Sequence, residues 1–451
     1  MAKMKHEDTI VAVATAAGEG SVAIVRVSGP EAVRMFEKAF VAKGKTPPFE
    51  THRLMLGKLM DESSMIDEVM GVVMYAPSTY TREDVCEIHT HGGQVAAALA
   101  VKRFIQLGAR PAQAGEFTRR AFVNGRIDLA QAEAVMGVIS AQSAAALRAE
   151  EAQLMGGQSR FVVGAQAALL SLLAGLEAYL DYPEEIGEEE ALEGLSEGLD
   201  ALIAMLEGAI DERGARIVRE GLKVALCGKP NAGKSTLFNA LLGEERAIVT
   251  EVPGTTRDVL HGTLMLDGVC VKVLDTAGLR DTEDQVERIG VERARQAIAQ
   301  ADVAFLLIDA SQPYEKDAAL EGVSCPCAVL LNKEDLGAVL EPEEVRAHMG
   351  DVPVFAISAK TGQGMSEVRA YLRQYIQLPQ QQLLTHERHM AVGREALARL
   401  CQAREALGGG KPLELAAVDL HDALYLLGRI TGESVDEKLL DDIFSRFCVG
   451  K

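Results

Sequence analysis

The stretch that decides the fold of the central region is Gly228-Lys229-Pro230-Asn231-Ala232-Gly233-Lys234-Ser235. It fits the pattern G-x-x-x-x-G-K-S, follows an apolar run at residues 223–227 and precedes a segment of helical composition. The pattern needs this context, because the loop amides and the N-terminus of the following helix then surround a phosphate. Lys234 is expected to reach the outer phosphates, and the Ser235 hydroxyl is expected to bind Mg²⁺. We therefore predict a P-loop nucleotide site.

Three later motifs follow further apolar strands. Asp275-Thr276-Ala277-Gly278 ends a strand, so Asp275 is expected to hold Mg²⁺ through water and the Gly278 amide to sense the γ-phosphate. Asn332-Lys333-Glu334-Asp335 follows another strand, and the Asp335 carboxylate can accept both N1–H and the exocyclic amine of guanine, a pair that adenine does not offer. Ser358-Ala359-Lys360 completes the base pocket. Four motifs in this order predict a Ras-like α/β GTPase domain.

The residues expected to contact GTP come from these motifs and from the loop at residues 250–256. They are Asn231, Ala232, Gly233, Lys234, Ser235, Thr236, Thr250, Glu251, Val252, Pro253, Gly254, Thr255, Thr256, Asp275, Thr276, Ala277, Gly278, Asn332, Lys333, Glu334, Asp335, Ser358, Ala359 and Lys360. Ras-type enzymes carry a glutamine after the aspartate motif to orient the attacking water, whereas this chain has Leu279. Leucine cannot orient water, so another residue must do so.

Metal ligands are expected in the same loops. Thr256 is placed to complete the Mg²⁺ shell with Ser235. A monovalent cation could be held by the Asn231 side chain with oxygens of Thr250, Val252 and Thr255, where other GTPases insert an arginine finger. The alternative is that Asn231 only stabilises the P-loop.

Composition limits what the rest of the chain can be. The 451 residues suggest about three domains. The formal charge of −20 has the wrong sign for indiscriminate attraction to phosphate backbones, so any contact with nucleic acid must be local. Seven cysteines without zinc-type pairs are typical of a reducing compartment. The apolar stretch at residues 161–180 is interrupted by Gln166, Ser171 and Glu177, so we expect a soluble, cytoplasmic protein without a membrane span.

The texture of the sequence divides the chain into three domains. Residues 1–125 mix β-like and helical segments, which predicts an N-terminal α+β domain. Residues 126–217 and 376–451 carry apolar side chains at three- and four-residue spacing, which predicts one all-α domain made of two segments. Residues 218–375 alternate strands with helices and contain a hairpin with Asp267-Gly268 at its turn. The fold class is therefore multidomain α/β plus α, with the GTPase domain inserted into the helical one.

Several short sequences outside the GTPase motifs are distinctive. They are Asp8-Thr9-Ile10-Val11-Ala12, Arg26-Val27-Ser28-Gly29, His91-Gly92-Gly93, Gly115-Glu116-Phe117-Thr118-Arg119-Arg120-Ala121-Phe122, Asn124-Gly125-Arg126-Ile127-Asp128-Leu129 and Phe447-Cys448-Val449-Gly450-Lys451. With the GTPase motifs they resemble, over the whole chain, the MnmE or TrmE family of tRNA modification GTPases. The resemblance implies an N-terminal domain that dimerises and binds folate, a helical domain built from two segments, and an inserted, potassium-dependent GTPase domain.

The resemblance also implies roles for single residues. Contacts to 5-formyl- or methylene-tetrahydrofolate fall on Arg26, Glu87, Arg126 and Lys451. Glu287 would position the catalytic water in place of the missing glutamine, although from the residues alone it would be interpreted as an exposed charge at a helix start. Cys448 becomes a candidate catalytic thiol, which its sequence position alone would not indicate.

The implied reaction adds an aminomethyl or carboxymethylaminomethyl group to carbon 5 of the wobble uridine of certain tRNAs. Folate would supply the one-carbon unit, and FAD would be carried by a partner flavoprotein, MnmG or GidA. The partner and a homodimer of this chain would form a heterotetramer. GTP hydrolysis with Mg²⁺ and K⁺ would then drive a conformational cycle.

Two other classes of GTPase remain as alternatives. A ribosome-assembly GTPase of the Era or EngA type shares the asparagine of the P-loop, but residues 375–451 lack a G-x-x-G clamp flanked by Lys and Arg. A membrane-remodelling GTPase would need an amphipathic basic helix, which the sequence does not offer. Candidate tRNA contacts, with ordinary solvated surface as the alternative, are Arg110, Arg119, Arg120, Arg126, Arg213, Arg216, Arg219, Arg388, Arg394, Arg399 and Arg404.

Overall fold

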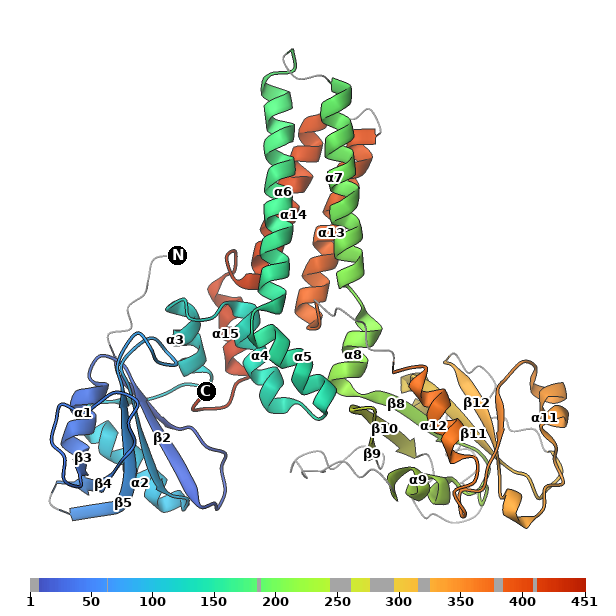
Figure 1. The fold of residues 1–451 in the computed structure, drawn as a ribbon, viewed down its shortest axis with the longest axis horizontal. Coiled ribbons are helices and arrows are strands. Elements are labelled where there is room, and N and C mark those ends of the chain that lie inside the picture. The colour runs from blue at the N-terminus through green and yellow to red at the C-terminus, as the bar shows by residue number, and fades with distance from the viewer. Residues whose placement is uncertain are drawn as a thin grey trace. The chain divides into compact units, whose positions relative to one another are not determined.

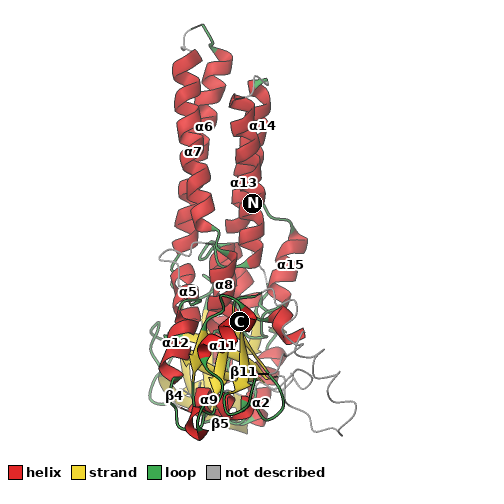
Figure 2. Ribbon diagram, turned by 90° about the vertical axis from the view of Figure 1, so that its right-hand side faces the viewer, coloured by secondary structure: helices red, strands yellow, loops and turns green. Residues whose placement is uncertain are grey.

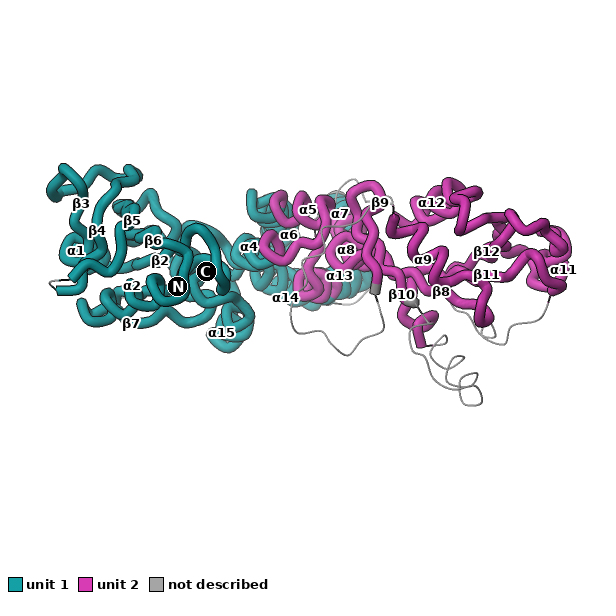
Figure 3. Tube along the Cα trace, turned by 90° about the horizontal axis from the view of Figure 1, so that it is seen from below, with its two compact units in different colours: residues 1–136, 153–202, 395–451 teal, residues 137–152, 203–394 magenta. Residues whose placement is uncertain are grey.

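The computed structural model describes residues 8–62, 64–184, 188–243, 261–275, 296–314, 325–376, 384–408 and 412–451. The chain forms two compact units, each assembled from separate stretches (Figure 3). The first unit contains residues 1–136, 153–202 and 395–451, and the second contains residues 137–152 and 203–394. The three domain boundaries expected from the sequence remain predictions.

The first unit begins with a seven-stranded sheet in the order β3-β4-β5-β6-β2-β1-β7. Its strands are β1 (Ile10–Val13), β2 (Val22–Ser28), β3 (Phe40–Ala42), β4 (Met55–Asp61), β5 (Ser64–Met74), β6 (Val85–His91) and β7 (Arg110–Pro111). Neighbours pair antiparallel except β1 and β7, which pair in parallel. Helices α1 (Ala32–Ala39) and α2 (Gln94–Gln106) pack on one face, where Phe36, Ile88 and Phe104 belong to one buried core.

The opposite face of this sheet carries charged and apolar side chains. Successive side chains of a strand point to opposite faces, so Arg26 and Glu87, which are cross-strand neighbours, lie on the face away from the core. Leu56 and Met70 are cross-strand neighbours on that same face and are 43% and 39% exposed. The face therefore combines an ion pair with an exposed apolar area.

The rest of the first unit is helical. Its shorter helices are α3 (Glu116–Val123), α4 (Leu129–Ser140) and α15 (Glu437–Ser445); α4 ends in the second unit, which also contains most of α5 (Ala144–Leu154). Four long helices, α6 (Gly157–Asp181), α7 (Glu188–Ala209), α13 (Glu387–Gly408) and α14 (Leu413–Thr431), lie side by side (Figures 1 and 2).

Helix α6 is the one described helix that is long and apolar enough to cross a membrane by length and composition. Its buried side chains recur at three- and four-residue spacing, as Val162, Ala165, Leu169 and Leu173 do. It packs along α14, and the exposed side of this contact carries hydrogen bonds between Glu177 and His421 and between Gln166 and Glu433. These are the contacts of a core helix in a bundle.

The second unit is built on a six-stranded sheet in the order β13-β12-β11-β8-β10-β9. Its strands are β8 (Leu222–Cys227), β9 (His261–Leu266), β10 (Val269–Asp275), β11 (Val303–Asp309), β12 (Cys327–Asn332) and β13 (Val354–Ala356). All are parallel except the edge strand β9. Among the described residues the unit also contains the helices α8 (Glu212–Glu220), α9 (Lys234–Gly243), α11 (Pro342–Met349) and α12 (Met365–Arg373), a helical segment at residues 296–300, and the short 3₁₀ helix η2 (Glu334–Leu336).

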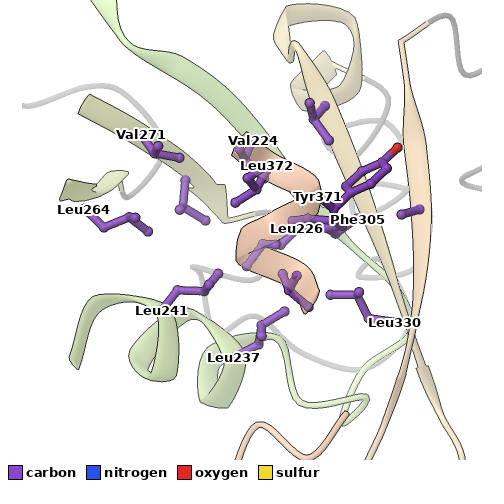
Figure 4. Close-up of a cluster of buried hydrophobic side chains, with 14 of the residues drawn as sticks. Val224, Leu226, Leu237, Leu241, Leu264, Val271, Phe305, Leu330, Tyr371 and Leu372 are labelled. Carbon is purple, nitrogen blue, oxygen red and sulfur yellow. The ribbon is translucent and has the colours of Figure 1, made fainter. Parts of the chain in front are cut away.

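One core of the second unit lies on the face of the sheet where α11 packs, and another lies on the opposite face, between the sheet and helices α9 and α12. Leu226 of β8, Phe305 of β11 and Leu330 of β12 meet Leu237 of α9 and Leu372 of α12 there (Figure 4). This packing fixes both the strand that precedes the P-loop and the helix that follows it. The predicted hairpin is confirmed: β9 and β10 are joined by Asp267 at φ 52° and Gly268 at φ 80°, which is the positive-φ pair of a tight hairpin turn.

Candidate functional site

The P-loop begins where the central strand β8 ends. β8 lies between β10 and β11, and the chain passes to β10 on one side and to β11 on the other. In such parallel sheets, ligands bind beyond the carboxyl ends of the strands at this switch in strand order. Asp275 closes β10 in register with Leu226 of β8, so the aspartate motif begins at the same edge as the P-loop.

The backbone of the P-loop has positive φ angles at three positions, and the residues found there are ones that tolerate such angles. Gly228, Asn231 and Gly233 have φ values of 139°, 65° and 100°. A Cβ at Gly228 would lie 2.3 Å from the Leu307 carbonyl oxygen of β11, and a Cβ at Gly233 would lie 2.2 Å from Nδ2 of Asn332. Both glycines of the G-x-x-x-x-G-K-S pattern are therefore required by close contacts as well as by backbone angle.

The Lys234 ammonium lies inside the loop. Its side chain is buried, and its Nζ donates hydrogen bonds to the carbonyl oxygens of Gly228 at 2.6 Å and of Lys229 at 2.9 Å. Ser235 and Thr236 are exposed in the first turn of α9. A cation enclosed by backbone at a helix N-terminus is the arrangement that receives the phosphates of a nucleotide.

Asn332 connects the P-loop to the base-binding motifs. This buried side chain donates from Nδ2 to the Ala232 carbonyl oxygen at 2.8 Å and accepts at Oδ1 from the Ala359 amide at 2.9 Å. The first and last of the predicted motifs are thus joined through one amide group. Its role here is to hold two loops together.

Asp335 is held by the last motif. The Ser358 hydroxyl donates to Oδ1 of Asp335 at 2.7 Å and accepts from the Thr361 amide at 3.2 Å. Asp335 itself is exposed, as a carboxylate that reads a guanine must be before the base binds. Glu334 is half-buried, and Lys360 is exposed beside them.

Asp309 is a member of this site that the sequence analysis missed. The Lys333 ammonium donates to Oδ2 of Asp309 at 2.7 Å, while Lys333 itself has a φ of 70°. Burial would raise the pKa of Asp309, but hydrogen bonds from Lys333 and Ser311 outweigh it and hold that pKa below its ordinary value. The sequence did offer one indication of this role: Asp309 ends β11, the strand before the one that the Asn332 motif follows.

Part of the predicted site lies outside the described residues. This holds for the loop residues Thr250, Glu251, Val252, Pro253, Gly254, Thr255 and Thr256, for Thr276, Ala277 and Gly278, and for Glu287. Their roles in binding GTP, Mg²⁺ and K⁺ and in positioning water remain predictions. Of the expected K⁺ ligands, the structure places Asn231, which is exposed in the P-loop.

A second cluster of predicted site residues lies on the face of the N-terminal sheet opposite α1 and α2. Nε of Arg26 donates to Oε1 of Glu87 at 2.7 Å, and the Arg26 guanidinium lies over the rings of Tyr80 and Phe117, 5.5 and 5.7 Å from their centroids. The Arg126 guanidinium lies 4.7 Å from the centroid of the same Tyr80 ring. Two arginines separated by 100 positions in the chain thus meet at one aromatic ring.

The C-terminal residues reach the same region. The Lys451 carbonyl oxygen accepts from the Phe117 amide at 3.2 Å, the Cys448 carbonyl oxygen accepts from the Gly115 amide at 3.4 Å, and Val449 forms a β-bridge with Ala114. Arg26, Glu87, Arg126 and Lys451 are therefore brought together around Tyr80 and Phe117. Cys448 is exposed and free.

Most of the arginines considered for tRNA contact are held by carboxylates. Arg120 is fully buried and donates hydrogen bonds to Asp8, Glu83 and Glu116. The prediction that Arg120 could contact RNA was therefore wrong. Ion pairs also engage Arg110, Arg119, Arg216, Arg219, Arg394, Arg399 and Arg404. Arg213 lies over the Tyr375 ring instead. Clusters of arginines in the sequence therefore do not indicate unpaired positive charge at the surface, because the many acidic residues of this chain form ion pairs with them.

A P-loop at the switch point of a parallel sheet, a buried lysine within it and an aspartate held to read guanine define a P-loop GTPase. Family models for the MnmE helical domain and for the N-terminus of the GTP-binding protein TrmE match residues 129–448 and 9–126. The chain belongs to the MnmE family of tRNA modification GTPases.

Relatives of this name match the chain over almost its full length. The tRNA modification GTPase MnmE of Heliobacterium modesticaldum is 41% identical and covers 98% of this chain and 99% of its own. The protein of that name from Listeria welshimeri is 39% identical with the same coverage. Among solved structures, the G domain of the T. maritima FeoB iron transporter is 28% identical, covers 35% of this chain and 99% of its own, and has a TM-score of 0.28. The full-length matches favour this family over the ribosome-assembly alternative.

Proposed function

We propose that this GTPase acts with an FAD-dependent partner of the MnmG (GidA) type to add an aminomethyl or carboxymethylaminomethyl group to carbon 5 of the wobble uridine in certain tRNAs. The one-carbon unit would come from 5-formyl- or methylene-tetrahydrofolate bound at the N-terminal domain. FAD would remain on the partner, and this chain would contribute the folate and the GTP-driven cycle.

The observation that supports folate binding is the convergence of Arg26, Glu87, Arg126 and Lys451 around two aromatic rings. A reduced folate has a flat, hydrogen-bonding pterin and an anionic glutamate tail. Guanidinium groups suit the carboxylates of that tail, and aromatic and carboxylate groups suit the pterin. The residues present therefore fit the group.

In the GTPase domain we propose that Ser235 and Thr256 bind Mg²⁺ and that Asn231, Thr250, Val252 and Thr255 bind K⁺. Glu287 would position the attacking water. The exposed, left-handed Asn231 supports the potassium site, because its side chain is not needed inside the loop. The geometry of Ser235 at the start of α9 supports the Mg²⁺ role.

We further propose that the protein is a cytoplasmic homodimer that forms a heterotetramer with the flavoprotein. Leu56 and Met70, two exposed cross-strand neighbours on the face of the N-terminal sheet opposite α1 and α2, support dimerisation there.

The test is the wobble nucleosides of total tRNA, digested and measured by mass spectrometry. Cells that lack the protein are compared with the same cells given the wild type or Cys448→Ser. We expect the aminomethyl-type uridines to disappear in the deletion, to return with the wild type, and to stay absent with Cys448→Ser. An unchanged nucleoside profile in the deletion, with no redundant enzyme, would contradict the tRNA function, and restoration by Cys448→Ser would remove Cys448 from catalysis.

A further inference from the structure

Tyr80 lies between two guanidinium groups on the face of the N-terminal sheet opposite α1 and α2, where its ring packs against the buried Phe117. Cζ of Arg26 is 5.5 Å and Cζ of Arg126 is 4.7 Å from the centroid of its ring, both within the range of a cation–π interaction. The ring is fixed at its far end, where its hydroxyl and Oγ1 of the buried Thr118 are 2.9 Å apart. Nη1 of Arg126 also donates to the Tyr80 carbonyl oxygen at 3.2 Å.

The charges around this ring do not balance. Arg26 has one carboxylate partner, Glu87. Within the part of the chain that the structure describes, no carboxylate lies within ion-pair distance of Arg126, which is exposed. Both guanidinium groups thus contact one aromatic ring, but of the two only Arg26 pairs with a carboxylate among the described residues, and the positive charge of Arg126 is available to an anion.

We propose that Tyr80 is a positioning residue of the folate site: its ring holds Arg26 and Arg126 in the orientation that receives the carboxylates of the glutamate tail. This inference rests on the proposed folate function. A guanidinium binds a carboxylate through a planar fork, so its orientation decides how many hydrogen bonds it makes. The face of an aromatic ring restricts that plane, and an aliphatic side chain of similar volume does not.

The experiment measures the affinity of the full-length protein for two ligands by isothermal titration. One is 5-formyl-tetrahydrofolate, and the other is 5-formyl-tetrahydropterin, which lacks the aminobenzoyl-glutamate tail. We expect Tyr80→Leu to weaken binding of the folate about tenfold and to change binding of the pterin less than twofold. Tyr80→Phe keeps the ring and is expected to stay within about threefold of the wild type for both ligands.

A merely structural role gives a different pattern. If Tyr80→Leu weakens both ligands equally, or weakens neither, the inference is wrong. Tyr75→Leu is the matched control, since Tyr75 packs against the helix-covered core of the same domain and is expected to leave the ratio of the two affinities unchanged. In an Arg126→Ala background the effect of Tyr80→Leu is expected to shrink, because Tyr80 acts through that guanidinium. A wild type that binds neither ligand would overturn the folate function itself, and this inference with it.

Discussion

The two sites of this chain are built in opposite ways. The nucleotide site is made of short contiguous motifs: the P-loop carbonyls that accept from Lys234, and the Ala359 amide that donates to Asn332, belong to such motifs. The N-terminal site is made of side chains from distant segments, which meet at Tyr80 and Phe117, and of the backbone of the C-terminal residues. A site of the first kind depends on a few local sequences, whereas a site of the second kind depends on strand register and packing.

The largest effect is expected from Lys234→Ala. The ammonium is enclosed by the loop and would face the outer phosphates, so its loss should lower kcat/KM for GTP hydrolysis by about a thousandfold or more. Lys272→Ala, on strand β10 of the same unit, is the control and is expected to keep the wild-type rate. The rate is measured by phosphate release. Near-normal hydrolysis by Lys234→Ala would show that hydrolysis does not depend on the ammonium.

Asp335→Asn tests whether the nucleotide site reads its base through one side chain. An asparagine cannot accept from both N1–H and the exocyclic amine, but its amide can donate to the 2-oxo group of xanthine. We expect GTP affinity to fall about a hundredfold and xanthosine triphosphate to become the preferred ligand. Asp351→Asn, an exposed aspartate before β13, should leave both affinities unchanged. Retained guanine preference in Asp335→Asn would place the specificity elsewhere.

The same contrast explains what could be predicted from the sequence. The motifs at residues 228–235, 332–335 and 358–360 could be placed in one site, because the carboxyl ends of parallel strands meet at one edge. The pairing of Arg26 with Glu87 depends on the register of β2 against β6, which no local pattern states. Only the family resemblance brought Arg126 and Lys451 to them.

Neither Tyr80 nor Phe117 was predicted as a site residue, although Phe117 belongs to one of the distinctive sequences of the family resemblance. Neither belongs to a pattern that carries chemistry by itself, and an aromatic residue in a sequence most often indicates core. The prediction for Arg120 was wrong for the converse reason. A basic residue in a basic cluster suggested an exposed position, but Arg120 is buried among three acidic side chains on a buried face of its helix. Burial of charge depends on partners that lie far away in the chain, as Asp8 and Glu83 do.

Glu116→Gln tests how far the N-terminal region depends on those buried charges. Burial would raise the pKa of Glu116. Hydrogen bonds from Arg110, from the backbone N–H of Gln113 and from Arg120 outweigh the effect of burial and hold that pKa below its ordinary value. A lowered pKa stabilises the fold above the unfolded pKa, and this stability is lost as pH falls through the folded value. We expect the variant to lose about 2 kcal/mol at pH 7, and the difference from the wild type to shrink in more acidic solution.

Hydrogen exchange of the β1 and β2 amides at neutral and acidic pH measures this difference. Glu50→Gln is the matched control, because Glu50 pairs with Arg53 in a fully exposed ion pair and is expected to change exchange at neither pH. If Glu116→Gln loses the same stability at both pH values, the network stabilises the domain through the packing of the Glu116 side chain rather than through its charge.

The smallest change in binding is expected from Asn231→Ala, which separates cation chemistry from the backbone of the P-loop. Asn231 is exposed with a φ of 65°, a conformation that asparagine tolerates better than alanine, so some loss of loop stability is expected in any substitution. Asn231→Gly removes the side-chain oxygen without that strain and is therefore compared with it. If the oxygen binds K⁺, both variants should lose a stimulation of hydrolysis by K⁺ over Na⁺ of about tenfold while GTP affinity stays within about threefold. Asn239→Ala, exposed on α9, should retain the stimulation. Stimulation that persists in Asn231→Gly and is lost only in Asn231→Ala would assign Asn231 to the geometry of the P-loop rather than to the cation.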